Sequence, residues 1–178
     1  MKNLVAALME PAAWPFPVEK VEHLETHISH LFLVGDHVYK VKKPLDLGFL
    51  DFSTLEKRRF YCGEEVRLNS RTAPGIYLGR VPITHDDRGY HVEGEGEAVE
   101  YAVKMRRFDQ RGLFDRYPLD DALVDALAEK VAGFHRSLAP APAGADWGAP
   151  EKVWFPMGQN FEQIRALGLF PAEEEQIG

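Results

Sequence analysis

Two short apolar runs on either side of a glycine constrain the fold of this chain more than any other feature. Residues 30–34 read His-Leu-Phe-Leu-Val and residues 37–43 read His-Val-Tyr-Lys-Val-Lys-Lys, with Gly35-Asp36 between them. Glycine supplies the tight turn that joins two such runs, so the pattern predicts a β-hairpin. Residues 22–29 are expected to form, or lead into, the preceding strand and its turn.

The second run of this hairpin carries the first candidates for chemistry. Because side chains alternate along a strand, Val38, Lys40 and Lys42 share one face. A lysine that faces inward there requires an anion, and an acid on the following helix, Glu65 or Glu64, could hold it in place. The other interpretation is that these lysines face solvent on an edge strand and that both glutamates lie on a solvated helix face.

A helix is expected after the hairpin. Ser53-Thr-Leu-Glu56 matches a capping box, in which Ser53 accepts hydrogen bonds from the first-turn amides and Glu56 reaches back. The helix is expected to run to about Arg71, ahead of Pro74-Gly75. Further strands are expected at residues 76–84, 90–93 and 99–105. The pattern therefore predicts a mainly antiparallel sheet that carries one helix.

The two ends of the chain have a different character. Residues 11–18 contain three prolines and predict an irregular arm whose Trp14 and Phe16 pack onto the body. Apolar residues at helical spacing predict an amphipathic helix over 119–138, followed by a loop at 139–150, a short helix at 161–169 and the first turn of another at 171–175. The predicted organisation is an arm (1–21), a sheet lobe (22–108) and the beginning of a helical lobe (109–178).

Composition limits the classes of function. The 178 residues include 28 acids and 21 bases, for a net charge of −7, which argues against a general nucleic-acid binder. No stretch is long and apolar enough for a membrane helix, and no signal peptide is expected, so we expect a cytoplasmic protein without a membrane partner. The lone Cys62 excludes an internal disulfide, and the spacing of His23, His27 and His30 does not favour a metal site.

Several segments carry a resemblance to a known family. They are Glu25-Thr-His-Ile-Ser29, Val38-Tyr-Lys-Val-Lys-Lys-Pro44, Leu47-Gly-Phe-Leu-Asp-Phe-Ser-Thr-Leu-Glu56, Glu64-Glu-Val-Arg-Leu-Asn69, Ala73-Pro74 with Tyr77-Leu78, and Val99-Glu-Tyr-Ala-Val-Lys-Met-Arg-Arg-Phe108. Together, over roughly residues 14–165, they resemble the amino-terminal part of the bacterial aminoglycoside-phosphotransferase-like proteins. Members of that family are often fused to a P-loop ATP-binding domain. The resemblance implies an α+β fold of the protein-kinase-like type, in which an antiparallel sheet lobe with one helix precedes a helical lobe.

The resemblance also implies a nucleotide site. Lys40 would hold the α- and β-phosphates of ATP, and Glu65 or Glu64 would pair with it from the helix. Val38 would contact the adenine, and the segment from Thr26 to Ser29 would form the turn over the phosphates. The residues from Met105 through Arg106 to Phe108 would be the hinge, whose backbone meets the adenine edge. The implied ligands are ATP and Mg²⁺, with an unknown small-molecule acceptor.

The chain departs from the family in the parts that perform the reaction. Phosphoryl transfer of this type needs a catalytic-loop Asp, an Asn five residues later and a second Asp on Mg²⁺, and this sequence offers none of them in the right order. We therefore expect no catalytic residue and no metal ligand in this chain, and a missing C-terminal half or P-loop domain as a partner. Three functions stay open: the ATP-binding portion of a small-molecule phosphotransferase, an inactive kinase-like module that binds nucleotide or a partner, and a gene remnant.

Overall fold

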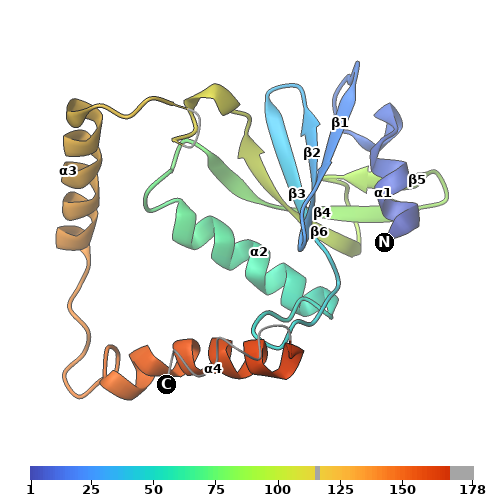
Figure 1. Ribbon diagram of the computed structural model, residues 1–178. Helices are drawn as coiled ribbons and strands as arrows, with labels where there is room; N and C mark the ends of the chain where they lie inside the picture. Colours follow the sequence, from blue (N-terminus) through green and yellow to red (C-terminus); the bar gives the residue numbers. More distant parts are fainter. Residues whose placement is uncertain (115–116, 169–178) are drawn as a thin grey trace. The chain divides into compact units, whose positions relative to one another are not determined.

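The chain divides into two compact units. The computed structural model describes residues 1–114 and 117–168 (Figure 1). The first unit is Met1–Lys130 and the second is Val131–Gly178. The first contains a sheet with helices and the second is helical in its described part, so the predicted α+β class is confirmed. No helix within the described ranges combines the length and the apolar character that crossing a membrane requires.

The first unit is built on one six-stranded antiparallel sheet. Its spatial order is β1-β2-β3-β6-β4-β5, so β6, the last of these six in sequence, lies between β3 and β4. The strands are β1 (Val21–Glu25), β2 (Ser29–Val34), β3 (His37–Lys42), β4 (Tyr77–Asp86), β5 (Gly89–Val92) and β6 (Ala98–Arg106). Each predicted strand is present, and the predicted hairpin is confirmed: Val34 pairs with His37, and Gly35 turns the chain with a φ of +55°.

One face of the sheet is covered by α2 (Leu55–Asn69), the helix that the sequence predicts. Its N-cap is Thr54, whose hydroxyl accepts from the Lys57 amide at 3.2 Å. The prediction that Ser53 caps the helix is therefore wrong by one residue. The Ser53 hydroxyl instead donates to Asp51 Oδ1 at 2.6 Å, so Asp51 organises the loop before the helix and leaves the cap to its neighbour.

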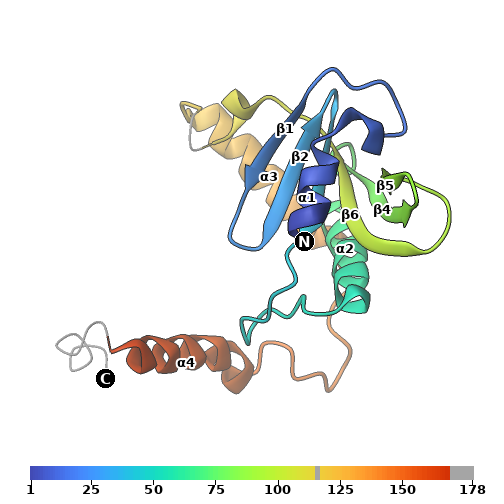
Figure 2. The same cartoon turned by 90° about the vertical axis from the view of Figure 1, so that its right-hand side faces the viewer.

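The opposite face is covered by the N-terminal segment (Figures 1 and 2). It contains the helix α1 (Lys2–Leu8), which the sequence analysis missed, and the 3₁₀ turn η1 (Pro11–Ala13). The predicted packing of Trp14 and Phe16 is confirmed. The Trp14 ring centroid lies 4.8 Å from that of Tyr39, and its Nε1 donates to the Leu8 carbonyl at 3.1 Å. Residues predicted as an arm therefore supply part of the main hydrophobic core.

Beyond the sheet, the chain is helical. The 3₁₀ turn η2 (Gln110–Gly112) is followed by α3 (Asp121–Ser137), as predicted, and by α4 (Pro150–Leu167). The prediction of a short helix at 161–169 is wrong, because α4 starts eleven residues earlier, with Pro150 in its first turn. Pro156, inside the helix, disfavours this longer helix on propensity alone. The predicted helix start at 171–175 lies outside the described residues.

Candidate functional site

The candidate site begins with an ion pair between β3 and α2. Lys40 Nζ donates to Glu65 Oε1 at 2.8 Å. Strand alternation directs Lys40 toward the face that α2 covers, and Glu65 lies in the third turn of that helix. Glu64 instead holds Arg67, with 2.7 Å between Oε2 and Nη2. Of the two acids that the sequence left open, the structure therefore brings Glu65, and not Glu64, to Lys40.

A second lysine completes this cluster, one that the sequence places on the same face as Lys40 but outside the predicted nucleotide site. Lys42 Nζ donates to the other carboxylate oxygen, Glu65 Oε2, at 2.5 Å. The Lys42 side chain is only 5% exposed, against 25% for Lys40. Its ammonium lies 4.7 Å from the centroid of the Phe52 ring. The signal in the sequence was the alternation that places Lys40 and Lys42 on one face.

The carboxylate of Glu65 is ionised by its two partners. Burial alone would raise its pKa, but hydrogen bonds from Lys40 and Lys42 outweigh burial and hold the pKa below its ordinary value. Two ammonium groups and one carboxylate leave a net charge of +1 on this cluster. A net positive, partly desolvated cluster attracts an anionic ligand.

The helix that carries Glu65 is fixed by a buried ion pair. Arg58 Nε lies 2.9 Å from both carboxylate oxygens of Glu100 on β6. Arg58 Nη1 also donates to the carbonyls of Phe52 and Ser53, at 3.0 and 3.2 Å. These bonds join α2, the preceding loop and β6, so they determine how far Glu65 stands from the sheet.

A cavity of about 320 Å³ lies on the same face of the sheet as Lys40. It is lined by Val38, which was predicted to contact the adenine, and by Phe108, which was predicted to belong to the hinge. Leu33, which pairs with Val38 across the strands, also lines it. Leu33, Asp109 and Gln110 were not predicted from the sequence, although strand pairing could have indicated Leu33. Arg107, the remaining lining residue, lies within the predicted hinge.

The predicted hinge is only partly free to bind a ligand through its backbone. Met105 and Arg106 are the last residues of β6, and neither lines the cavity. The Arg106 amide donates to Ile76 and the Arg107 amide donates to Asp36, each at 2.8 Å. The Phe108 amide has no hydrogen-bond partner among residues 1–114 and 117–168. A donor for the edge of a base is therefore available at Phe108 and not at Arg106.

The turn from Thr26 to Ser29 is closed by its own hydrogen bonds. The Thr26 hydroxyl donates to the Ser29 carbonyl at 3.2 Å and accepts from the Ser29 amide at 3.0 Å. Ser29 pairs with Lys42 across the strands and is fully buried, and its hydroxyl has no partner within the described ranges. The role of this turn over phosphates stays a prediction.

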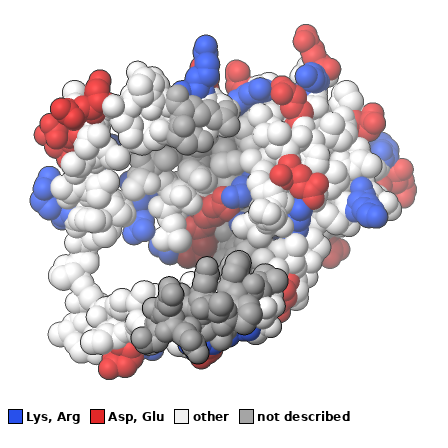
Figure 3. Space-filling view, in the orientation of Figure 1, with Lys and Arg blue, Asp and Glu red and all other residues white. Residues whose placement is uncertain are grey.

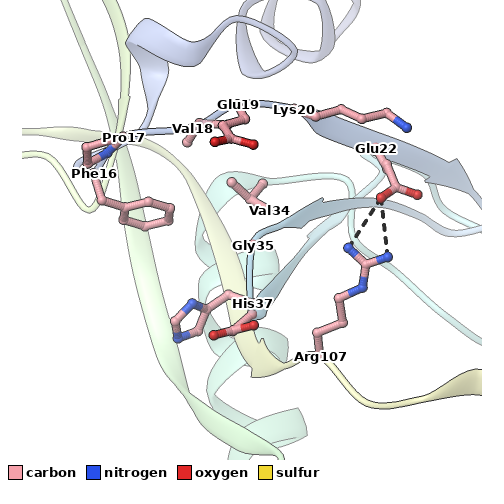
Figure 4. Close-up of a pocket in the computed structure, with 11 residues that line it drawn as sticks. Phe16, Pro17, Val18, Glu19, Lys20, Glu22, Val34, Gly35, His37 and Arg107 are labelled. Carbon is pink, nitrogen blue, oxygen red and sulfur yellow. Dashed lines mark hydrogen bonds and ion pairs between the residues drawn. The ribbon is translucent and has the colours of Figure 1, made fainter.

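A larger cavity, of about 560 Å³, lies near the turn between β2 and β3 (Figure 4). Phe16, Val34 and His37 line it, and Arg107 reaches across to Glu22 Oε1 at 3.2 Å. Of the residues predicted for the nucleotide, this cavity contains Arg107 alone, which lies within the predicted hinge. Arg107 lines both this cavity and the smaller one, so the two are neighbours.

The remaining polar candidates form structural contacts. His23 Nε2 and His30 Nδ1 lie 3.1 Å apart in stacked rings. No group of three possible metal-ligating side chains occurs within the described part of the chain. Burial raises the pKa of the Cys62 thiol to about 11, which makes it a poor nucleophile. On the face that Figure 3 shows, positive and negative side chains are interspersed.

Comparison with known proteins identifies relatives but no family. Uncharacterized proteins of Mycobacterium bovis and of two strains of Mycobacterium tuberculosis are each 39% identical to this chain over 117 residues. The match covers 63% of this chain and 22% of each relative, so the chain spans about a fifth of the length of the relatives it matches. Neither a protein-family model nor a solved structure matches the chain.

Proposed function

We propose that the sheet unit is the nucleotide-binding lobe of an ATP-dependent phosphotransferase of the aminoglycoside-phosphotransferase-like, kinase-like class. The observation that carries the proposal is the ion pair between Lys40 on β3 and Glu65 on the helix that follows. In kinases, a lysine on the third strand and a glutamate on the next helix must be paired for the nucleotide's phosphates to be held. The 2.8 Å distance between Lys40 Nζ and Glu65 Oε1 supports the same role here.

Two further features support this proposal. The cavity beside Val38 and Phe108 lies on the Lys40 face of β3, so an adenine there would place its phosphates toward the lysine. Leucine, valine and phenylalanine side chains suit the faces of a base, and the Phe108 amide suits an acceptor on its edge. Arg107, which also lines this cavity, donates from Nη2 to Glu22 Oε1 at 3.2 Å.

The chain's own residues would bind and orient the nucleotide. Lys40 would contact the phosphates, Glu65 would keep Lys40 extended, and the cavity would take the base. Mg²⁺ would supply charge neutralisation on the phosphates, but the described residues offer no cluster of carboxylates for it, so we derive no step through the metal. Transfer to an acceptor hydroxyl, and recognition of the acceptor, would require residues that this chain does not provide.

A nucleotide-binding module without catalysis is the second candidate. It is favoured by the lack, anywhere in the sequence, of an Asp followed five residues later by Asn in the order that the reaction needs. Both candidates share nucleotide binding, and they differ in turnover. ATP hydrolysis or transfer by a longer protein that contains this chain would separate them.

Calorimetric titration of the chain with ATP and with adenosine tests the shared step. We expect Lys40→Ala to weaken ATP binding by about tenfold or more, since it removes a charged phosphate contact, and to leave adenosine binding unchanged. Val38→Trp fills the cavity and is expected to weaken both ligands. Lys104→Ala is the matched control, because Lys104 pairs with Glu93 on the opposite face of the sheet. Wild-type protein that binds neither ligand would refute the proposal.

A further inference from the structure

Lys42 is the feature that the proposed function leaves unexplained. A nucleotide lobe needs one strand lysine for the phosphates, yet β3 presents two to the same carboxylate. The two differ in access: Lys40 is reached from solvent, whereas Lys42 is enclosed between Glu65, Phe52 and the body of the sheet. Both lysines donate to Glu65, but their exposure to solvent differs, which indicates that they have different roles.

We propose that Lys42 is a positioning residue, the permanent counter-ion of Glu65, so that Lys40 can stay paired with Glu65 while its charge remains available to an anionic ligand. This inference rests on the proposed function and deepens it, because it assigns the second lysine to the control of phosphate binding. Each lysine holds its own oxygen of Glu65, so Lys42 balances the carboxylate through Oε2 without displacing Lys40 from Oε1.

The surroundings of Lys42 explain why it is held at Glu65, whereas Lys40 stays open to a ligand. Its ammonium lies over the ring of Phe52, which is itself buried. The carbonyl of Phe52 accepts from Arg58 at 3.0 Å, so the ring is held by the same bonds that fix α2. Lys40, in contrast, has Glu65 as its only hydrogen-bond partner among the described residues. One lysine is fixed on several sides and the other on one.

The charge count gives the expected magnitude. With Lys42 present, the cluster carries +1 and attracts phosphate. Without it, Glu65 and Lys40 neutralise each other, and the phosphates must compete with Glu65 for the only lysine. Removing one unit charge a few ångströms from an anion in a partly buried site weakens its binding by roughly tenfold or more. Adenosine carries no phosphate, so its binding does not depend on this charge.

The test titrates ATP and adenosine into four variants by calorimetry. Lys42→Met is expected to weaken ATP about tenfold and to leave adenosine unchanged, and Lys42→Arg, which keeps the charge, is expected to restore ATP binding. The double variant Lys42→Met with Glu65→Gln returns the cluster to +1 and keeps a side-chain oxygen that can accept from Lys40, so it is expected to bind ATP better than Lys42→Met alone. Lys104→Met removes a lysine from the other face and is expected to change neither ligand.

Either of two outcomes of this titration would overturn the inference. One is wild-type affinity for ATP in Lys42→Met. The other is a double variant weaker than Lys42→Met, since a merely structural Lys42 would make the second substitution an added loss. If Lys42→Met does not fold, the double variant, which leaves no uncompensated carboxylate, is compared with the wild-type protein. A much weaker affinity for ATP in the double variant then overturns the inference.

A measurement without ligand separates this inference from the proposed function. We expect an NMR titration of the Glu65 carboxyl to show a larger rise of its pKa in Lys42→Met than in Lys40→Met, since Lys42 is the more buried partner. Equal or reversed effects would refute the role of Lys42. A wild-type protein that binds no nucleotide would refute the proposed function. The comparison of the Glu65 pKa in the two variants, in contrast, tests the pairing of Lys42 with Glu65 without any ligand.

Discussion

Replacing Glu100 by Gln is the substitution that we expect to damage the sheet unit most. Glu100 is 2% exposed, and both of its carboxylate oxygens accept from Arg58 Nε at 2.9 Å. Oε1 also accepts from the Tyr101 amide at 3.0 Å. A glutamine keeps one oxygen but places an amide donor against the Arg58 donor, and it removes the carboxylate that balances this buried guanidinium.

The expected loss of unfolding free energy follows from this geometry. Removing one partner of a buried ion pair costs about 3–5 kcal/mol, because the other charge stays buried without compensation. Arg58 retains the carbonyls of Phe52 and Ser53, so the lower part of that range, about 3 kcal/mol, is expected. With a urea m value of about 1.5 kcal/mol per molar, the unfolding midpoint should fall by about 2 M.

Tryptophan fluorescence gives a specific assay. The chain contains three tryptophans, and Trp14 is buried in the core of the sheet unit while Trp147 and Trp154 are exposed. In a background with Trp147→Phe and Trp154→Phe, urea unfolding followed at Trp14 reports on the sheet unit. Glu64→Gln, which breaks the exposed pair with Arg67, is the matched control and is expected to cost less than about 0.5 kcal/mol.

The reasoning would be refuted by a loss of less than about 1 kcal/mol in Glu100→Gln, the scale of an ordinary hydrogen bond. A second comparison sharpens the result. Arg58→Met with Glu100→Leu removes both charges, so it should be more stable than Glu100→Gln even though it deletes more hydrogen bonds. If the double variant is the weaker of the two, the buried charge is not the source of the loss.

Two further changes have predictable effects on stability. Gly94→Ala should lower the free energy of unfolding by about 1–3 kcal/mol, because a Cβ there would lie 2.1 Å from Thr84 Oγ1 and 3.0 Å from the His91 carbonyl oxygen. In the control Gly75→Ala, the new Cβ meets no atom within 4 Å, so its effect should be near zero. Urea unfolding compares the two variants, and equal effects would contradict the steric explanation. Burial lowers the pKa of His30, so the unfolded state takes up a proton first as pH falls. The free energy of unfolding should therefore decline below about pH 6.5, until His30 protonates in the folded state as well. His30→Gln should flatten this part of the plot of unfolding free energy against pH, and an unchanged plot would exclude His30 as the source of the decline.

The elements that could be predicted from the sequence are those with a strong local signal. The hairpin around Gly35 and the amphipathic α3 follow from periodicity and turn chemistry, and both occur where expected. The helix α1 was missed because seven residues are too few to form a stable isolated helix. It is held instead by Leu4 and Leu8 packing into the core.

The candidate site was predictable in outline. Alternation placed Lys40 on the face toward α2, but the choice between Glu64 and Glu65 depends on how that helix is rotated against the sheet, which is a tertiary property. The position of Lys42 was readable, while its burial against Phe52 was not, because Phe52 belongs to a loop whose course no periodicity describes. Asp109 and Gln110, which follow β6 and line the cavity, were missed for the same reason.

The position of β6 also governs the order in which the chain can fold. This strand inserts between β3 and β4, so residues 98–106 must arrive before the two halves of the sheet can join. Its pairing with β3 spans more than fifty residues, a sequence separation that slows folding. During synthesis, the β1-β2-β3 hairpins would therefore emerge with an open edge, and β6, the last of these six strands to appear, would be the one that joins the two halves of the sheet.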